Sequence, residues 1–126
     1  MFIYKNPNPG NKTVGDCVIR ALSILLDMSW DKVYDELTEL GHDMYDMPSS
    51  NEVWSEYLYI KGYTKAIIPD MCPYCYRVKK FCQDYPEGRY LLAIGTHVVT
   101  VIDGNYYDTW DSGEEIPIYY FKRRNI

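Results

Sequence analysis

The chain has 126 residues, of which 47% are hydrophobic and 25% are charged, and its formal net charge is -5. These proportions are typical of a globular protein and exclude a largely disordered chain. The length suits a single hydrophobic core, and two domains would be cramped. We therefore expect residues 1–126 to form one domain.

The acidic charge also bears on partners and location. Phosphate contacts need a basic surface, so nucleic acid is not expected as the main partner. The basic cluster Lys122-Arg123-Arg124 is interpreted as a solvated tail. No stretch reaches the roughly 18 apolar residues of a membrane span, and the first residues do not resemble a signal peptide. We expect a cytoplasmic protein with no membrane partner and with its four cysteines reduced.

Helical signals fill most of the first two thirds of the chain. From Cys17 onward, apolar residues recur at three-and-four spacing, which predicts an amphipathic helix. Ser49 and Glu52 form a capping box at the start of another helix, and Gly62 ends it. The four helices that we expect span roughly residues 16–27, 29–41, 49–62 and 78–85.

The remaining segments have the character of strands. Short runs rich in β-branched and aromatic residues alternate with glycine turns, and Asp103-Gly104-Asn105 predicts a hairpin turn. Residues 1–15 are rich in turn signals and are expected to run extended over the surface. The predicted strands are 64–68, 90–94, 97–103, 105–110 and 116–121. We predict an α+β fold with N-terminal helices packed on a C-terminal antiparallel sheet.

Cys17 stands where the first predicted helix begins, directly after Gly15 and Asp16. Asp16 is the expected N-cap of this helix. The first-turn amides direct their positive ends outward, so they would stabilise a thiolate and lower the pKa of Cys17 from about 8.5. This position indicates a nucleophile. The alternative is a small buried hydrophobic residue, which is the common role of a free cysteine.

A cysteine nucleophile needs a base, and the base needs a third group that orients it. Of the two histidines, His42 lies in an acidic loop, whereas His97 opens a predicted strand and can face a helix N-terminus. His97 is therefore the better base. The orienting carboxylate should come from the next strand, and Asp108 and Asp111 are both candidates. Counting across the turn places a residue near 112 opposite His97, but diagonal neighbours allow a shift of a few residues.

The chain order of cysteine, histidine and acid resembles that of papain-like cysteine peptidases. In that superfamily a glutamine six residues before the nucleophile supplies an oxyanion-hole donor, and Asn11 stands at this spacing before Cys17. The segment Asp108-Thr109-Trp110 is similar to the Asn-Ser-Trp of papain-type enzymes and favours Asp108 over Asp111. The resemblance implies a papain-like fold with Cys17, His97, Asp108 and Asn11 as catalytic residues.

Two narrower resemblances accompany this one. The pair Asp16-Cys17 is similar to that of bacteriocin-processing cysteine peptidases. Three motifs resemble a family of small proteins of Firmicutes and their phages, for which no substrate is established. These motifs occupy residues 15–21, 96–104 and 106–113.

The other cysteines raise the question of a metal site. Cys72 and Cys75 have the CxxC spacing of half a structural zinc site, and Cys82 follows, but a fourth ligand is missing. We interpret these thiols as packing residues and expect neither a metal nor a cofactor. The acidic loop around His42 lacks the glycine and the terminal glutamate of a calcium loop.

The leading hypothesis is a cysteine hydrolase that cleaves a peptide, amide or isopeptide bond of a peptide or protein substrate through a thioester intermediate. One alternative is a catalytically inactive papain-like binding protein, such as a phage protein that acts on host machinery, which the acidic, tyrosine-rich composition would suit. Another is an acyltransferase of the transglutaminase type, which shares the triad and differs in the acceptor.

Overall fold

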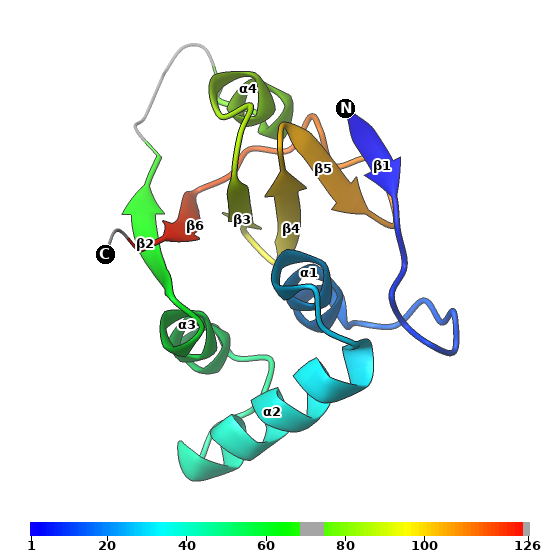
Figure 1. The fold of residues 1–126 in the computed structure, drawn as a ribbon, viewed down its shortest axis with the longest axis vertical. Coiled ribbons are helices and arrows are strands. Elements are labelled where there is room, and N and C mark those ends of the chain that lie inside the picture. Colours follow the sequence, from blue (N-terminus) through cyan, green and yellow to red (C-terminus); the bar gives the residue numbers. More distant parts are fainter. Residues whose placement is uncertain (69–74, 125–126) are drawn as a thin grey trace.

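The computed structural model describes residues 1–68 and 75–124, and in these residues the chain forms four helices and a six-stranded mixed sheet (Figure 1). The expected α+β class is confirmed. In chain order, the elements are β1 (Phe2–Tyr4), α1 (Cys17–Leu26), α2 (Trp30–Asp43), α3 (Asn51–Ile60), β2 (Tyr63–Ile67), α4 (Val78–Asp84), β3 (Arg89–Ile94), β4 (His97–Ile102), β5 (Asn105–Asp108) and β6 (Tyr119–Arg123).

The strands lie in the order β1-β5-β4-β3-β6-β2. All neighbouring pairs are antiparallel except β1 with β5, which run parallel with Phe2 opposite Tyr106. The N-terminal segment therefore starts as an edge strand instead of running only over the surface, and the sheet is mixed where we expected an antiparallel one. The three residues Phe2–Tyr4 are too few to show a strand pattern in the sequence, and their pairing depends on a strand about a hundred residues away.

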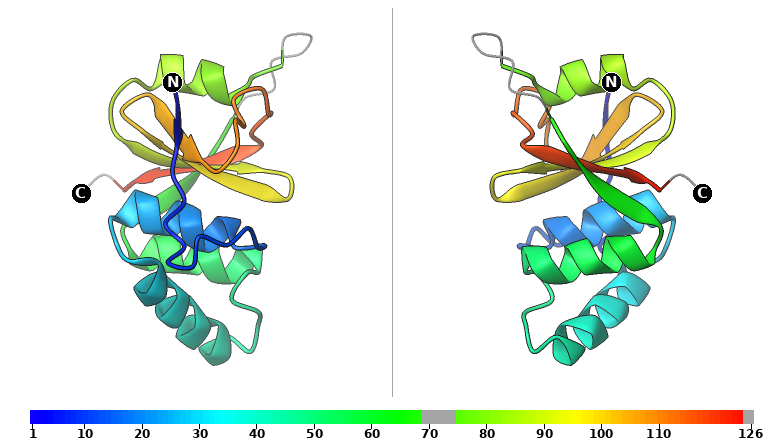
Figure 2. Two further views of the ribbon diagram at one scale, coloured as in Figure 1. Left: turned by 90° about the vertical axis from the view of Figure 1, so that its right-hand side faces the viewer. Right: turned by 90° about the vertical axis from the view of Figure 1, so that its left-hand side faces the viewer.

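The sheet separates two hydrophobic clusters. Helices α1, α2 and α3 lie on one side of it, and α4 covers the other side (Figure 2). The packing of N-terminal helices on the sheet is thus confirmed. On the first side, α1 packs on β3 and β4, where Thr100 Oγ1 donates a hydrogen bond of 2.6 Å to the Ala21 carbonyl oxygen. Arg89 Nη1 donates to the Leu25 carbonyl oxygen at 2.8 Å, so α1 is fixed to the sheet near its C-terminal end as well.

The helix boundaries follow local capping chemistry. Helix α2 begins near Ser29 as expected, and Ser29 is its N-cap, because its Oγ accepts from the Lys32 N–H at 3.1 Å. For α3 the expected cap was wrong by one residue: Ser50, not Ser49, accepts from the Val53 N–H, at 3.3 Å. Helix α2 continues past Gly41 to Asp43, so this glycine does not end the helix. A Cβ atom at Gly41 would lie 2.9 Å from the Asp46 carbonyl oxygen, so the residue allows a close approach of the following loop.

The hairpin between β4 and β5 brings the second half of the site into place. Asp103 and Gly104 both have positive φ, 50° and 77°, and Ile102 pairs with Asn105 across them. The expected hairpin turn is therefore present, and its two central residues are Asp103 and Gly104. The longest helix in the described part of the chain, α2, has 14 residues, and none of the helices there is long and apolar enough to cross a membrane.

Candidate active site

Cys17 is the first residue of α1, and it lies where this helix meets the start of β4. Its side chain is half-buried. Asp16 occupies the N-cap position as expected, but its side chain makes no capping hydrogen bond. The expected side-chain cap is therefore wrong. Because no carboxylate covers this helix end, the thiol lies next to uncapped N–H groups.

His97 and Asp108 are joined by a short hydrogen bond. His97 is the first residue of β4, Asp108 is the last of β5, and Nε2 of the ring lies 2.6 Å from Oδ2 of the carboxylate. The same carboxylate accepts from Ser112 Oγ at 3.0 Å and from the Thr109 N–H at 2.8 Å. Asp108 is 5% exposed and Ser112 is fully buried, so these three bonds hold the carboxylate in one orientation.

The other side of the His97 ring faces Cys17. His97 interacts with the thiol and lowers its pKa, and because Nε2 is engaged by Asp108, Nδ1 is the ring nitrogen left for the sulfur. The Val98 N–H also stabilises the thiolate. The sulfur of α1, the ring of β4 and the carboxylate of β5 therefore form one continuous set of interactions.

The electrostatics of this chain favour charge separation. Burial acts to raise the pKa of Cys17, but the hydrogen bond and the charge of His97, the Val98 N–H and the charge of Arg20 outweigh it and lower that pKa. Burial acts to lower the pKa of His97, but the hydrogen bonds and charges of Asp108 and Cys17 raise it to about 9. Because the two shifts have opposite directions, both favour a thiolate–imidazolium pair over a neutral thiol and imidazole, and the thiolate is the stronger nucleophile.

Trp110 packs on the histidine. Its ring centroid lies 4.9 Å from that of His97 at an interplanar angle of 39°, and it is 42% exposed. The indole covers one side of the His97–Asp108 bond. The sequence singled out Trp110 only by its resemblance to a motif, and it gave no signal for Ser112, whose contact depends on how the loop after β5 folds back.

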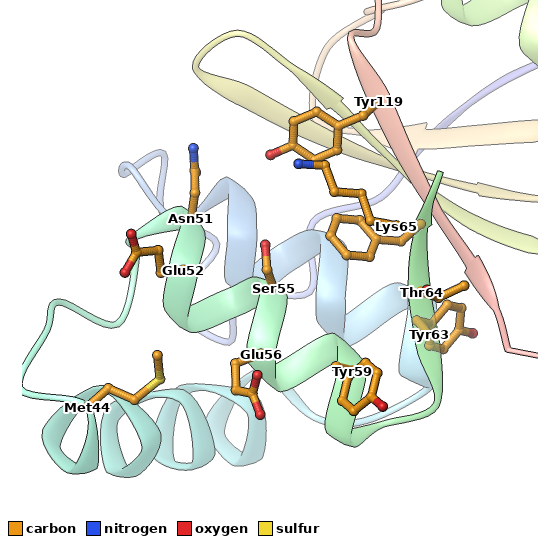
Figure 3. Close-up of a pocket in the computed structure, with 11 residues that line it drawn as sticks. Met44, Asn51, Glu52, Ser55, Glu56, Tyr59, Tyr63, Thr64, Lys65 and Tyr119 are labelled. Carbon is orange, nitrogen blue, oxygen red and sulfur yellow. The ribbon is translucent and has the colours of Figure 1, made fainter. Parts of the chain in front are cut away.

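Cys17 and His97 line a cavity of about 200 Å³, and Asn51 and Tyr119 form part of its wall. A more open hollow of about 740 Å³ shares both of these residues, so the two adjoin. In Figure 3 this hollow runs along α3, with Ser55 on the helix, and Lys65 lies against the Tyr119 ring at 4.0 Å. The cavity beside Cys17 therefore adjoins a larger groove along α3.

Asn11, the expected oxyanion donor, is not brought to this cavity. It lies in an exposed turn with a φ of 50°, its side-chain oxygen accepts from Asn6 Nδ2 at 3.4 Å, and it is not among the residues that line the cavity. Asn51 supplies an amide there instead. Trp54 Nε1 donates to Asn51 Oδ1 at 3.0 Å, which fixes the amide so that Nδ2 is the free end (Figure 3). Sequence spacing could not find Asn51, because it lies 34 residues after the nucleophile.

The remaining candidates lie elsewhere. Asp111 accepts from the Tyr106 hydroxyl at 2.5 Å and from the Gly113 N–H, so Asp108 is the carboxylate that meets His97. His42 is exposed on α2. Cys82 is a buried residue of α4, where burial raises its pKa, and Cys75 is exposed. Cys72, and with it the zinc interpretation of the CxxC pair, lies outside the described residues.

Among residues 1–68 and 75–124, no group of three or more His, Cys, Asp or Glu side chains is arranged to hold a metal ion. The site geometry is thus that of three side chains, Cys17, His97 and Asp108, next to a helix N-terminus and beside a groove. No family model, no curated protein and no solved structure matches this chain.

Proposed function

We propose that this protein is a papain-like cysteine hydrolase that cleaves a peptide, amide or isopeptide bond with Cys17 as the nucleophile. The observation that carries the proposal is the position of His97, which lines the same cavity as Cys17, shifts the pKa of that thiol and is hydrogen-bonded to Asp108. A cysteine, a base in contact with it and a group that orients the base are what nucleophilic catalysis by a thiol requires.

The first half of the reaction is acylation. The Cys17 thiolate attacks the carbonyl carbon, and the carbonyl electrons move onto the oxygen. Uncapped N–H groups at the start of α1, with that of Cys17 nearest, would hold this oxyanion, and one such donor contributes about 2.7–4 kcal/mol in measured hydrolases. The His97 imidazolium then gives its proton to the leaving nitrogen, the C–N bond breaks, and an amine departs from a thioester.

The second half is deacylation. Neutral His97, still held by Asp108, takes a proton from a water molecule, and the resulting hydroxide attacks the thioester carbon. The C–S bond breaks and its electrons return to the sulfur. The carboxylic acid departs, and the thiolate and imidazolium are restored. An amine in place of water would give acyl transfer by the same steps.

Three further features fit this assignment. The groove that adjoins the cavity at Asn51 and Tyr119 suits an extended peptide or a protein segment better than a compact small molecule. The contact of the tilted Trp110 and His97 rings agrees with the resemblance of this segment to papain-type enzymes. A reducing compartment protects a thiolate from oxidation, so we propose the cytoplasm as the location. The net charge of -5 does not suit nucleic acid as a partner, and we propose no membrane partner.

Site-selective alkylation tests the proposal. Iodoacetamide at pH 7 should modify Cys17 faster than Cys72, Cys75 and Cys82, as measured by mass spectrometry of the digested protein. His97→Ala should remove this preference, while Cys82→Ser should leave it unchanged. Equal reaction of Cys17 and the exposed Cys75 in the native protein would contradict an activated thiol.

A second experiment distinguishes hydrolysis from acyl transfer by identifying the product that leaves the acyl-enzyme. Wild-type protein acylated at Cys17 by an activated ester is divided between buffer and buffer with added glycinamide. Release of free acid in both samples supports hydrolysis. Capture of the acyl group by glycinamide in preference to water supports the transglutaminase-type alternative, and a stable acyl-enzyme supports an inactive binding protein.

A further inference from the structure

Asp16 departs from the usual behaviour of a residue that precedes a helix. It stands at the N-cap of α1 with φ −112° and ψ 25°, and an aspartate there normally accepts a hydrogen bond from the second or third helical N–H group. In this protein its side chain makes no such bond. Asp16 is nevertheless only 6% exposed, so its carboxylate is buried for another reason.

The carboxylate is bound by groups from three segments. Arg20, one turn further along α1 and itself 8% exposed, forms an ion pair with Oδ1. Trp30 Nε1, from the first residue of α2, donates to Oδ2 at 2.9 Å. Asn8 Nδ2, from the N-terminal segment, donates to the same oxygen at 3.1 Å. Asp16 therefore ties the N-terminal segment, α1 and α2 together immediately before the nucleophile.

This arrangement determines what the helix end presents to the cavity. The first bond within α1 runs from the Arg20 N–H to the Asp16 carbonyl oxygen, at 2.9 Å. In the described part of the chain, no side chain accepts from the N–H groups that precede Arg20 in this helix. A carboxylate turned onto these groups would occupy them and would place a negative charge beside the Cys17 sulfur. Because the Asp16 carboxylate is turned away and paired with Arg20, it leaves these N–H groups free and places no unpaired negative charge beside the sulfur.

We propose that Asp16 is a positioning residue whose carboxylate is held away from the end of α1, so that the N–H of Cys17 stays aimed at the oxyanion formed during acylation. This inference rests on the proposed hydrolase function and adds to it how the oxyanion donor is kept free. Asp16 does not touch the substrate. It acts through the orientation of the backbone at residues 16 and 17.

Two reactions of the same thiol isolate this effect. Iodoacetamide reacts by displacement: the sulfur bonds to the methylene carbon and iodide leaves, so no oxyanion forms. With p-nitrophenyl acetate the thiolate adds to the carbonyl carbon, an oxyanion forms, the ester C–O bond breaks and p-nitrophenolate leaves with its electrons. Both rates depend on the thiolate, but only acylation depends on the N–H donor. The ratio of the acylation rate to the alkylation rate therefore reports the oxyanion site.

The experiment compares this ratio in wild-type protein, Asp16→Ser and Trp30→Phe. Serine is a strong N-cap that accepts from the second or third helical N–H group with its own backbone extended, whereas Asp16 has ψ 25°. Asp16→Ser should therefore turn the peptide between residues 16 and 17, move the N–H of Cys17 off the oxyanion and lower the ratio about tenfold or more. Trp30→Phe keeps the charges of Asp16 and Arg20 but removes one hydrogen-bond donor to Asp16, so it should lower the ratio by a smaller factor. This variant tests the inference if Asp16→Ser fails to fold. The rate measured with Cys17→Ala, which comes from the other cysteines alone, is subtracted from each rate.

The control for lost stability is Phe81→Leu, which lies on the opposite side of the sheet and should lower the melting temperature without changing the ratio. An unchanged ratio in both Asp16→Ser and Trp30→Phe would overturn the inference, even if both variants melt earlier. A purely electrostatic role of Asp16 would change both rates together and leave their ratio constant, which also overturns it. If wild-type Cys17 is neither alkylated preferentially nor acylated, it is the proposed hydrolase function that fails.

Discussion

The Nε2 atom of His97 lies 2.6 Å from Oδ2 of Asp108, although these two residues are not partners in the β4–β5 ladder. The last pair of that ladder is Thr100 with Tyr107, and beyond it β5 ends at Asp108. The contact is therefore made by side chains alone, across the open end of the hairpin. Its geometry is set by the bonds that Ser112 and the Thr109 N–H make to the same carboxylate.

The first prediction concerns this carboxylate. Asp108→Ala removes the partner of His97, so the imidazole loses its orientation and the charge that raises its pKa. We expect the rate at which p-nitrophenyl acetate acylates Cys17 to fall about 10²-fold, the lower range for a positioned proton-transfer group. The matched control is Asp111→Ala, because Asp111 bonds to Tyr106 instead of His97. Equal losses in the two variants would show that Asp108 has no special role.

The second prediction is a pH dependence. The pKa of Cys17 is lowered and that of His97 is raised to about 9, so the thiolate persists below the pKa of an ordinary thiol. In His97→Ala the thiol should titrate near its ordinary value of about 8.5, where only about 1% is ionised at pH 6.5. We therefore expect the alkylation rate at pH 6.5 to fall about tenfold or more in this variant. At pH 10, where both proteins carry the thiolate, the two alkylation rates should be similar. The midpoint of the pH dependence of alkylation should lie at a higher pH in His97→Ala than in the wild type.

Cleavage of an amide should also decline as pH rises through about 9, because His97 then loses the proton that it gives to the leaving amine. Alkylation needs only the thiolate and should reach a plateau over the same range. If alkylation and amide cleavage rise and fall together, His97 is not the acid that protonates the leaving nitrogen during acylation.

Sequence reasoning located the parts of this site that depend on local signals. The start of α1 at Cys17, the start of β4 at His97 and the turn at Asp103 and Gly104 were all expected, because capping, strand and turn preferences act over a few residues. The register of β4 against β5 was not predicted correctly. The turn is centred between Asp103 and Gly104, and extrapolation of the ladder places residue 110, not 112, opposite His97. Asp108 is then a diagonal neighbour of His97, and Trp110 lies over its ring.

What the sequence could not supply were contacts between distant segments. The pairing of β1 with β5, the bond from Ser112 to Asp108, the partners of Asp16 and the amide of Asn51 beside Cys17 all depend on how elements pack. Spacing from the nucleophile favoured Asn11. The turn that contains Asn11 leaves its side chain exposed and bonded to Asn6, because short polar residues near glycine and proline satisfy their hydrogen bonds locally.

The third prediction separates these two asparagines. Asn51→Asp keeps the oxygen that accepts from Trp54 but replaces the free amide donor with a carboxylate, so it should slow acylation by p-nitrophenyl acetate about tenfold or more relative to alkylation. Asn11→Asp should leave the ratio of the two rates unchanged. The opposite pattern, a loss with Asn11→Asp alone, would restore Asn11 as the oxyanion donor and require its turn to move on substrate binding.

The fourth prediction concerns Ser112, a fully buried residue whose hydroxyl donates to the carboxylate of Asp108. Ser112→Ala removes one bond to a charged acceptor that is itself buried, and such bonds contribute about 1.5–3 kcal/mol. We expect the free energy of unfolding, measured by urea denaturation at pH 7, to fall by about that amount. Thr13→Ala, an exposed substitution, should change it by less than about 0.5 kcal/mol.

Reactivity should follow a different course in Ser112→Ala. Because His97 and the Thr109 N–H still bind the carboxylate, Asp108 keeps most of its orientation, and acylation of Cys17 should fall by much less than in Asp108→Ala. A large loss of stability with a small loss of reactivity would identify Ser112 as a residue that anchors the carboxylate in the fold. If reactivity falls as far as in Asp108→Ala while stability is unchanged, the hydroxyl must itself set the angle at which Asp108 meets His97.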